Sequence, residues 1–308
     1  SGLNIRSGEA GKDDKAKLIS RAIFGNGPKD EGKLGTNVFN KYGIASDGFD
    51  IVSNQFSLHY FFENNQVLNG FLRNVSECCR VGGYFIGCCY DGEKIFDILK
   101  DIGQEETKRI VSFKNRDNIM LSIKKKYNDG TFKNDHTCVG KRIDVMQESI
   151  NKVFPEYLVN FKYLSRLLSN YGFSELTKEE TESVNLPNSI GSFKEFYNKM
   201  KQDHRGGSIN DRSVGSAFKM SIQEKEISFL NNYFIFKKRT DVDTDLVSKN
   251  MQTGNSSNFE SNMESKMDSD VNTGSPEKLI KLRPTIKKLG KIIIATDESG
   301  ISDDGKEY

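Results

Sequence analysis

Apolar residues along the chain follow two spacings, one typical of strands and one typical of helices. Residues 49–56 (FDIVSNQF) form an apolar run that predicts a strand buried on both faces, and residues 84–90 (YFIGCCY) predict a second strand. Between them, apolar positions over residues 64–79 recur at helical spacing, and another helix is expected over 92–101. This strand–helix–strand–helix order indicates a βαβ unit with a parallel sheet.

Further elements are expected on both sides of this unit. Residues 110–113, 119–126 and 137–148 alternate between apolar and polar positions, which predicts strands of a sheet that turns antiparallel. Residues 204–214 are polar and contain glycine, so we expect a loop there. The remaining expected elements are helices over 12–24, 37–42, 160–171 and 190–200, and a final strand over 228–238.

The character of the chain changes at residue 240. Residues 240–276 are rich in Asp, Ser, Asn, Met and Thr and show no periodicity, so we expect them to be disordered. Residues 278–296 form a basic segment with a short apolar centre, either a solvated tail or a peptide that docks on a partner or on RNA. We therefore predict a folded domain over 1–239 and a disordered tail over 240–308.

Composition excludes several classes of protein. The net charge of +2 does not indicate a polyanion partner, although local basic patches remain able to bind one. Five cysteines, four of them in adjacent pairs, do not form a secreted disulfide framework or a zinc knuckle, so no metal site is expected. The sequence has no apolar run long enough for a membrane helix and no signal peptide, which predicts an intracellular protein.

Polar side chains that could bind a ligand stand at the end of the first predicted strand and directly after it. Gln55, His59 and Tyr60 come just after this strand, and in open α/β sheets ligands bind beyond the carboxyl ends of strands. The placement alone is also compatible with a polar strand end that carries a packed aromatic ring.

Several motifs in order make the prediction specific. The stretch FDIVSNQFSLHYFFEN, then GGYFIG, FPEYLV (154–159) and SFKEFY (192–197), resembles the mRNA cap guanine-N7 methyltransferases, especially those in capping enzymes of large DNA viruses. The resemblance covers residues 1–239. It implies an α/β fold of the class I (Rossmann-like) S-adenosylmethionine-dependent methyltransferases, and transfer of a methyl group from S-adenosylmethionine to N7 of the cap guanine.

The resemblance also assigns residues to the site. Gln55 and Tyr60 are expected on the methyl-donor side, and His59 and Glu156 at the guanine. A family tyrosine that contacts the cap falls on Asn231, and a small shift of register would place Tyr233 there instead. The carboxylate of Glu156 suits guanine, because it can accept hydrogen bonds from both N1–H and N2–H₂. Guanine N7 loses no proton on methylation, so no catalytic acid or base is expected.

One part of the family pattern is not found. The chain has no Gly-rich DxGxGxG loop after a buried strand, and no acidic residue after such a loop. We therefore expect an N-terminally incomplete methyltransferase fold whose first strand has an open edge, and weak binding of S-adenosylmethionine by this chain alone. Expected partners are the capped 5′ end of mRNA and either upstream capping-enzyme domains or a complementary methyltransferase half, in the cytoplasm, nucleus, virus factory or virion.

Two other functions remain open on the sequence. The chain could be a non-catalytic methyltransferase-like subunit that stabilises a catalytic partner. It could instead be an RNA-binding module that acts through the basic segments 108–126 and 278–291. Cap-independent RNA binding with a steep salt dependence would favour the RNA-binding module.

Overall fold

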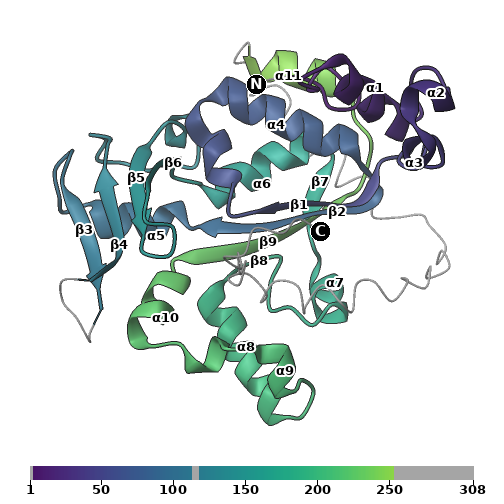
Figure 1. Ribbon diagram of the computed structural model, residues 1–308. Helices are drawn as coiled ribbons and strands as arrows, with labels where there is room; N and C mark the ends of the chain where they lie inside the picture. Colours follow the sequence, from purple (N-terminus) through teal and green to yellow (C-terminus); the bar gives the residue numbers. More distant parts are fainter. Residues whose placement is uncertain (1–2, 113–117, 253–308) are drawn as a thin grey trace, which may run out of the picture.

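The computed structural model describes residues 3–112 and 118–252 of the 308-residue chain (Figure 1). Its main sheet has the strand order β1-β2-β9-β7, and β8 also pairs with β9. Strands β1 and β2 are parallel, as predicted, and β9 runs antiparallel to its neighbours. The strands are β1 (Phe49–Gln55), β2 (Cys79–Tyr90), β7 (Phe173–Glu175), β8 (Ile190–Ser192) and β9 (Asn231–Lys238).

A second sheet packs beside the first and is wholly antiparallel, with the order β3-β4-β5-β6. Helix α5 and apolar side chains of this sheet form a core with Tyr90 at the end of β2. The alternating pattern predicted antiparallel strands here, but it did not predict that they form a separate sheet or that β6 belongs to it. Its elements are β3 (Thr107–Val111), β4 (Ile119–Lys125), β5 (Arg142–Gln147), β6 (Val153–Tyr157) and the neighbouring α5 (Gly92–Leu99).

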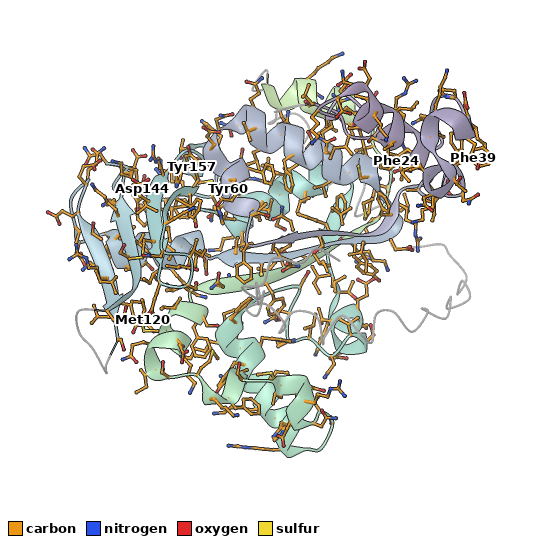
Figure 2. All side chains as sticks on the ribbon, viewed as in Figure 1. Phe24, Phe39, Tyr60, Met120, Asp144 and Tyr157 are labelled. Atoms are coloured by element: carbon orange, nitrogen blue, oxygen red, sulfur yellow. The ribbon has the colours of Figure 1, made fainter. Side chains whose placement is uncertain are left out.

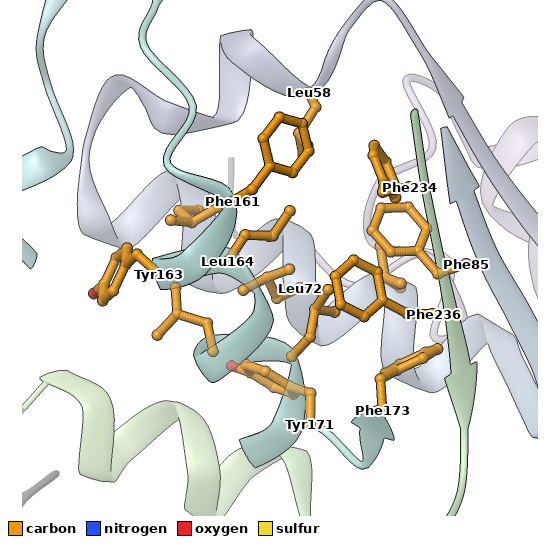
Figure 3. Close-up of a cluster of buried hydrophobic side chains, with 14 of the residues drawn as sticks. Leu58, Leu72, Phe85, Phe161, Tyr163, Leu164, Tyr171, Phe173, Phe234 and Phe236 are labelled. Atoms are coloured by element: carbon orange, nitrogen blue, oxygen red, sulfur yellow. The ribbon is translucent and has the colours of Figure 1, made fainter. Parts of the chain in front are cut away.

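Helices cover both faces of the main sheet (Figure 1). Helices α4 (Asn65–Cys78) and α6 (Phe161–Asn170) pack on one face, over a core rich in phenylalanine (Figure 3). On the other face, α7 and the α8–α10 group lie beneath β8 and β9 (Figure 1). The remaining helices are α1 (Asp14–Ile23), α2 (Glu31–Leu34), α3 (Thr36–Phe39), η1 (Leu58–Glu63), η2 (His136–Cys138), α7 (Lys178–Ser183), α8 (Phe193–Arg205), α9 (Asp211–Val214), η3 (Ala217–Lys219), α10 (Ile222–Ser228) and α11 (Thr244–Gln252).

A glycine allows close contact between β1, β2 and β9. A Cβ atom added to Gly87 would lie 2.0 Å from the backbone oxygen of Asn54 and 2.4 Å from Cζ of Phe234. Any other residue at position 87 would therefore push apart the two strands or the phenylalanine core. This glycine keeps the carboxyl ends of β1 and β2 side by side.

Several predictions, on the burial of β1 and on where elements begin and end, are wrong. Strand β1 is not buried on both faces: Phe49 is 41% exposed, and among the described residues β1 pairs only with β2. The expected loop over 204–214 contains the end of α8 and all of α9. The predicted final strand begins only at Asn231, because the capping box at Ser221 starts helix α10. The first residues of the predicted helix 190–200 form strand β8, and the strand expected from 137 starts at 142.

The chain does not become disordered at residue 240. Helix α11 packs on α4, where Asp245 lies 2.9 Å from Arg73 and the hydroxyl of Thr244 donates to Glu77 over 2.7 Å. Val247 of α11 is buried among the core residues. The rest of the expected tail, including the basic segment 278–296, lies outside the described residues.

Replacing Val247 with Ala lowers the free energy of unfolding by about 1.5 kcal/mol, because two buried methyl groups are lost. Leu246→Ala, one residue away on the same helix but 49% exposed, is the matched control and changes it by less than about 0.5 kcal/mol. Urea unfolding of both variants makes the comparison. Equal effects of the two substitutions would show that α11 is not docked in solution.

Three findings on the described residues bear on the class of protein expected from the sequence: on membrane helices, on metal clusters and on cysteines. In the described ranges 3–112 and 118–252, no helix has the length and apolar character to cross a membrane. Within the same ranges, His, Cys, Asp and Glu side chains form no cluster suited to a metal ion. All five cysteines are buried and carry free thiols.

Candidate functional site

His59 and Glu156 lie face to face at the junction of the two sheets. His59 belongs to η1, which the fully buried Leu58 and Phe62 anchor in the main core. Glu156 belongs to β6, opposite the buried Ile143 of β5. The Nδ1 atom of His59 is 3.7 Å from Oε2 of Glu156, which is too long for a hydrogen bond.

Both side chains are buried without a partner. Only 7% of the His59 side chain and 12% of the Glu156 side chain are exposed. Both ring nitrogens of His59 and Oε2 of Glu156 are buried and make no hydrogen bond within the described part of the chain. An unpaired buried polar atom costs about 1–3 kcal/mol, so three together indicate a place where a polar ligand supplies the missing bonds.

Burial shifts the titration of both groups towards their neutral forms. It lowers the pKa of His59 to about 4 and raises the pKa of Glu156 to about 7. His59 is therefore neutral near pH 7, with one ring N–H to donate. Glu156 is partly protonated near pH 7. A ligand that offers hydrogen-bond donors favours the ionised carboxylate, and the proton then passes to water.

Tyr60 forms the exposed wall of the site. Its ring centroid lies 4.2 Å from that of His59 in an edge-on arrangement, and the residue is 42% exposed. Figure 2 labels Tyr60 close to Tyr157 of β6, where η1 packs against that strand. Burial and the negative charge of Glu156 both raise the pKa of Tyr60. The ring is thus placed between the buried pair and solvent.

Gln55 lies at the carboxyl end of β1, as the sequence predicted, and its side chain is held by two neighbours. Its Oε1 accepts a hydrogen bond from the thiol of Cys88 over 3.0 Å, and its Nε2 donates to the hydroxyl of Ser53 over 3.0 Å. These bonds fix the amide on the sheet face that carries Cys88. Gln55 therefore borders the end of β1 rather than the space between His59 and Glu156.

The two candidates on β9 have different surroundings. Asn231 is buried next to Tyr90 of β2, and its Nδ2 donates to the Ser228 carbonyl over 3.1 Å, while its Oδ1 has no partner in the described residues. Tyr233 is 1% exposed and packs against Phe196 in the core beneath the sheet, which raises its pKa to about 12. Of these two, Asn231 has the free acceptor that a ligand contact needs.

Three residues near the site escaped the sequence analysis. Phe56 follows β1 with a φ of 50°, which is unusual for a residue other than glycine, and its side chain is 41% exposed. Tyr90 ends β2, and Nε2 of Gln147 donates to its hydroxyl oxygen. A position at the end of a predicted strand was the available signal for Tyr90, whereas no sequence pattern reports the φ of Phe56.

The lysines at the end of the first basic segment are engaged within the protein. Lys124 and Lys126 both pair with Glu105. Lys125 is buried and donates to the carbonyl groups of Leu99 and Ile102. These three lysines are therefore not free to form a basic patch for RNA, whereas Lys108 and Arg109 on β3 are exposed.

Comparison with known proteins decides the family. Residues 32–239 match the model of the mRNA (guanine-N(7))-methyltransferase domain. The chain belongs to this family. The predicted α/β fold of the S-adenosylmethionine-dependent methyltransferases is thereby confirmed, and helix α11 lies beyond the matched residues.

Curated relatives are considerably longer than this chain. It is 28% identical over 191 residues to an mRNA cap guanine-N(7) methyltransferase of Candida glabrata, covering 61% of this chain and 43% of that protein. A counterpart from Aspergillus oryzae is 24% identical over 218 residues, with coverages of 62% and 40%. A probable mRNA-capping enzyme of Acanthamoeba polyphaga mimivirus is 22% identical over 225 residues, which is 67% of this chain and 18% of that enzyme. The chain thus spans less than half the length of these relatives.

Proposed function

We propose that this chain supplies the guanine-binding half of an mRNA cap guanine-N7 methyltransferase, which methylates the cap with S-adenosylmethionine as donor. The observation that carries the proposal is the buried His59–Glu156 pair, with three polar atoms that lack partners. In a chain of this family, guanine is the ligand whose hydrogen-bonding groups match that pair.

The match can be followed group by group. Guanine offers N1–H and N2–H₂ as adjacent donors, and the two oxygens of the Glu156 carboxylate can accept both. The single N–H of neutral His59 suits O6, and the ring of Tyr60 closes the exposed side. Asn231 adds an acceptor at the edge of the site, where the family has a tyrosine.

Methyl transfer then requires alignment rather than acid–base chemistry. S-adenosylmethionine, when bound, would supply a methyl group on a sulfonium, and this methyl group would pass to guanine N7 as its bond to sulfur breaks. Gln55, whose amide is fixed by Cys88 and Ser53, and Tyr60 border the end of β1, where donors bind in open α/β sheets. Their role is to hold donor and guanine in line at near-attack distance.

The open edge of β1 supports a further partner. Beside this strand lies an open groove of about 510 Å³, lined almost entirely by apolar side chains that include Phe49, Ile51 and Val52. An unpaired strand with exposed apolar residues is prone to association. We propose that the remaining part of the methyltransferase domain, from the same longer polypeptide or a separate chain, covers this edge.

The cellular setting follows from the proposed reaction, because capping acts on mRNA inside the cell. The similarity to the mimivirus enzyme supports a viral capping enzyme, and the similarity to the fungal enzymes supports a cellular one. The proposal on guanine recognition is the same for both sources.

Titration calorimetry with a capped and an uncapped form of one short RNA tests the proposed function. With an RNA whose body contains no guanine, we expect the capped form to bind at least about tenfold more tightly, since only it presents the guanine that Glu156 can read. Equal affinities that fall steeply with salt would instead support a cap-independent RNA-binding module.

A further inference from the structure

The geometry points to Tyr90 and Gln147 as a positioning link that holds Glu156 in register with His59. The inference rests on the proposed function, because it concerns the geometry of the same guanine site. Neither residue was singled out from the sequence.

The link joins the two sheets at their junction. Tyr90 is the last residue of β2 in the main sheet, and Gln147 is the last residue of β5 in the second sheet. Nε2 of Gln147 donates to the hydroxyl oxygen of Tyr90. Around this bond the contact between the sheets is apolar, formed by side chains such as Ile143 and Leu158. Apolar contacts have no direction, so this hydrogen bond is suited to fixing how the sheets are aligned.

Alignment of the sheets decides the separation of His59 and Glu156. His59 follows β1 in the main sheet, whereas Glu156 lies on β6, which pairs with β5. The distance of 3.7 Å between Nδ1 of His59 and Oε2 of Glu156 therefore spans the same junction that the Tyr90–Gln147 bond crosses. Backbone hydrogen bonds such as that from Gly92 N–H to the Val159 carbonyl over 3.0 Å also cross this junction. Loss of the Tyr90–Gln147 bond is therefore expected to loosen the alignment of the sheets locally, with each side chain kept on its own sheet.

Tyr90 also lies within electrostatic range of the carboxyl group. The charge of Glu156 contributes to the raised pKa of Tyr90. Because Gln147 already donates to the phenol oxygen, the phenol proton is left to be donated to another acceptor. We infer that this proton faces Glu156, where it would favour the ionised form, so removal of the hydroxyl is expected to raise the pKa of the carboxyl.

A double-mutant cycle with Tyr90→Phe and Gln147→Leu tests the link. Each substitution removes the hydrogen bond while keeping a side chain of similar size. We expect each single variant to bind the guanosine-capped dinucleotide GpppA about five- to tenfold more weakly, and the double variant to be no weaker than either. Tyr127→Phe is the matched control, because Tyr127 is buried in the same apolar cluster and its hydroxyl has no partner in the described residues.

A second measurement needs no ligand and separates this inference from the proposed function. The ¹³C signal of the Glu156 carboxyl is titrated by NMR in the unliganded protein, and its midpoint should rise in Tyr90→Phe and stay unchanged in Tyr127→Phe. An unchanged midpoint in Tyr90→Phe, or additive losses of affinity in the cycle, would overturn the link. If the wild type does not bind GpppA at all, the proposed function fails and the NMR titration alone decides whether Tyr90 acts on Glu156.

Discussion

Replacing Glu156 with Gln is expected to weaken binding of GpppA about 100-fold at pH 8, which corresponds to about 3 kcal/mol. In the proposed site the carboxylate accepts two hydrogen bonds from guanine, and each bond to a charged group contributes about 1.5–3 kcal/mol. A glutamine has one acceptor, and its NH₂ group would face a guanine donor. Titration calorimetry of the two proteins measures the loss.

Acidity should affect the two proteins differently. Because the pKa of Glu156 is raised to about 7, the wild type should lose affinity about tenfold per pH unit below that value, as the carboxyl takes up a proton. Glu156→Gln should show no such trend between pH 8 and 5.5. Glu148→Gln, which removes an exposed carboxyl just beyond the far end of β5, is the control and should behave as the wild type. Parallel pH profiles for wild type and Glu156→Gln would exclude Glu156 as the group that reads guanine.

The same substitution is expected to stabilise the unliganded protein at pH 8. Burial raises the pKa of Glu156 from 4.5 to about 7, so the folded state holds this proton more tightly than the unfolded state does. The associated stability is therefore fully present below pH 4.5 and is lost as the pH rises through 7. Above pH 7 the ionised, unpartnered carboxylate costs up to about 3 kcal/mol, most of which a neutral glutamine avoids.

Urea unfolding at two pH values measures this effect. The free energy of unfolding of Glu156→Gln should exceed that of the wild type by about 1–3 kcal/mol at pH 8 and by much less at pH 4.5. Burial lowers the pKa of His59, so protonation of His59 on acidification lowers the free energy of unfolding of both proteins. This contribution cancels in the difference between them. Glu182→Gln, at an exposed position on α7, should change stability little at either pH. A wild type more stable than Glu156→Gln at pH 8 would show that the carboxylate has a stabilising partner when no ligand is bound.

The elements that carry the site residues could be predicted from the sequence, but the proximity of His59 to Glu156 could not. The strand that ends in Gln55, and the placement of His59 and Tyr60 just beyond it, follow from the apolar pattern and the motif. That His59 lies opposite Glu156 depends on how two sheets pack, which no local spacing encodes. The motif indicated both residues, and the structure adds that both ring nitrogens of His59 and Oε2 of Glu156 are buried without a hydrogen-bond partner among the described residues.

Strand β9 shows a similar limit of prediction from the sequence, which could not decide between two residues for one position in the site. Asn231 and Tyr233 point to the same side of the strand because side chains alternate, so the pattern could not separate them. What separates them is α8, whose Phe196 covers Tyr233 and leaves Asn231 beside Tyr90. That cover is a tertiary contact made by a helix distant in sequence.

Helix α11 was missed for a different reason. Its polar composition is typical of disorder, and nine residues form a marginal helix on their own. The helix persists because Val247 is buried and Asp245 pairs with Arg73 of α4. By contrast, α8 itself was predicted, but its start was placed at residue 190, although the capping box of Ser192 and Glu195 was the available signal for where strand β8 ends.

The central claim, that Glu156 reads the N1–H and N2–H₂ edge of guanine, is tested most directly by removing one hydrogen-bonding group from the ligand. Inosine-capped IpppA lacks only the N2 amino group of GpppA. The wild type is expected to bind GpppA at least about tenfold more tightly than IpppA, and Glu156→Gln should lose most of this preference. Equal affinities of the wild type for the two ligands would contradict the account.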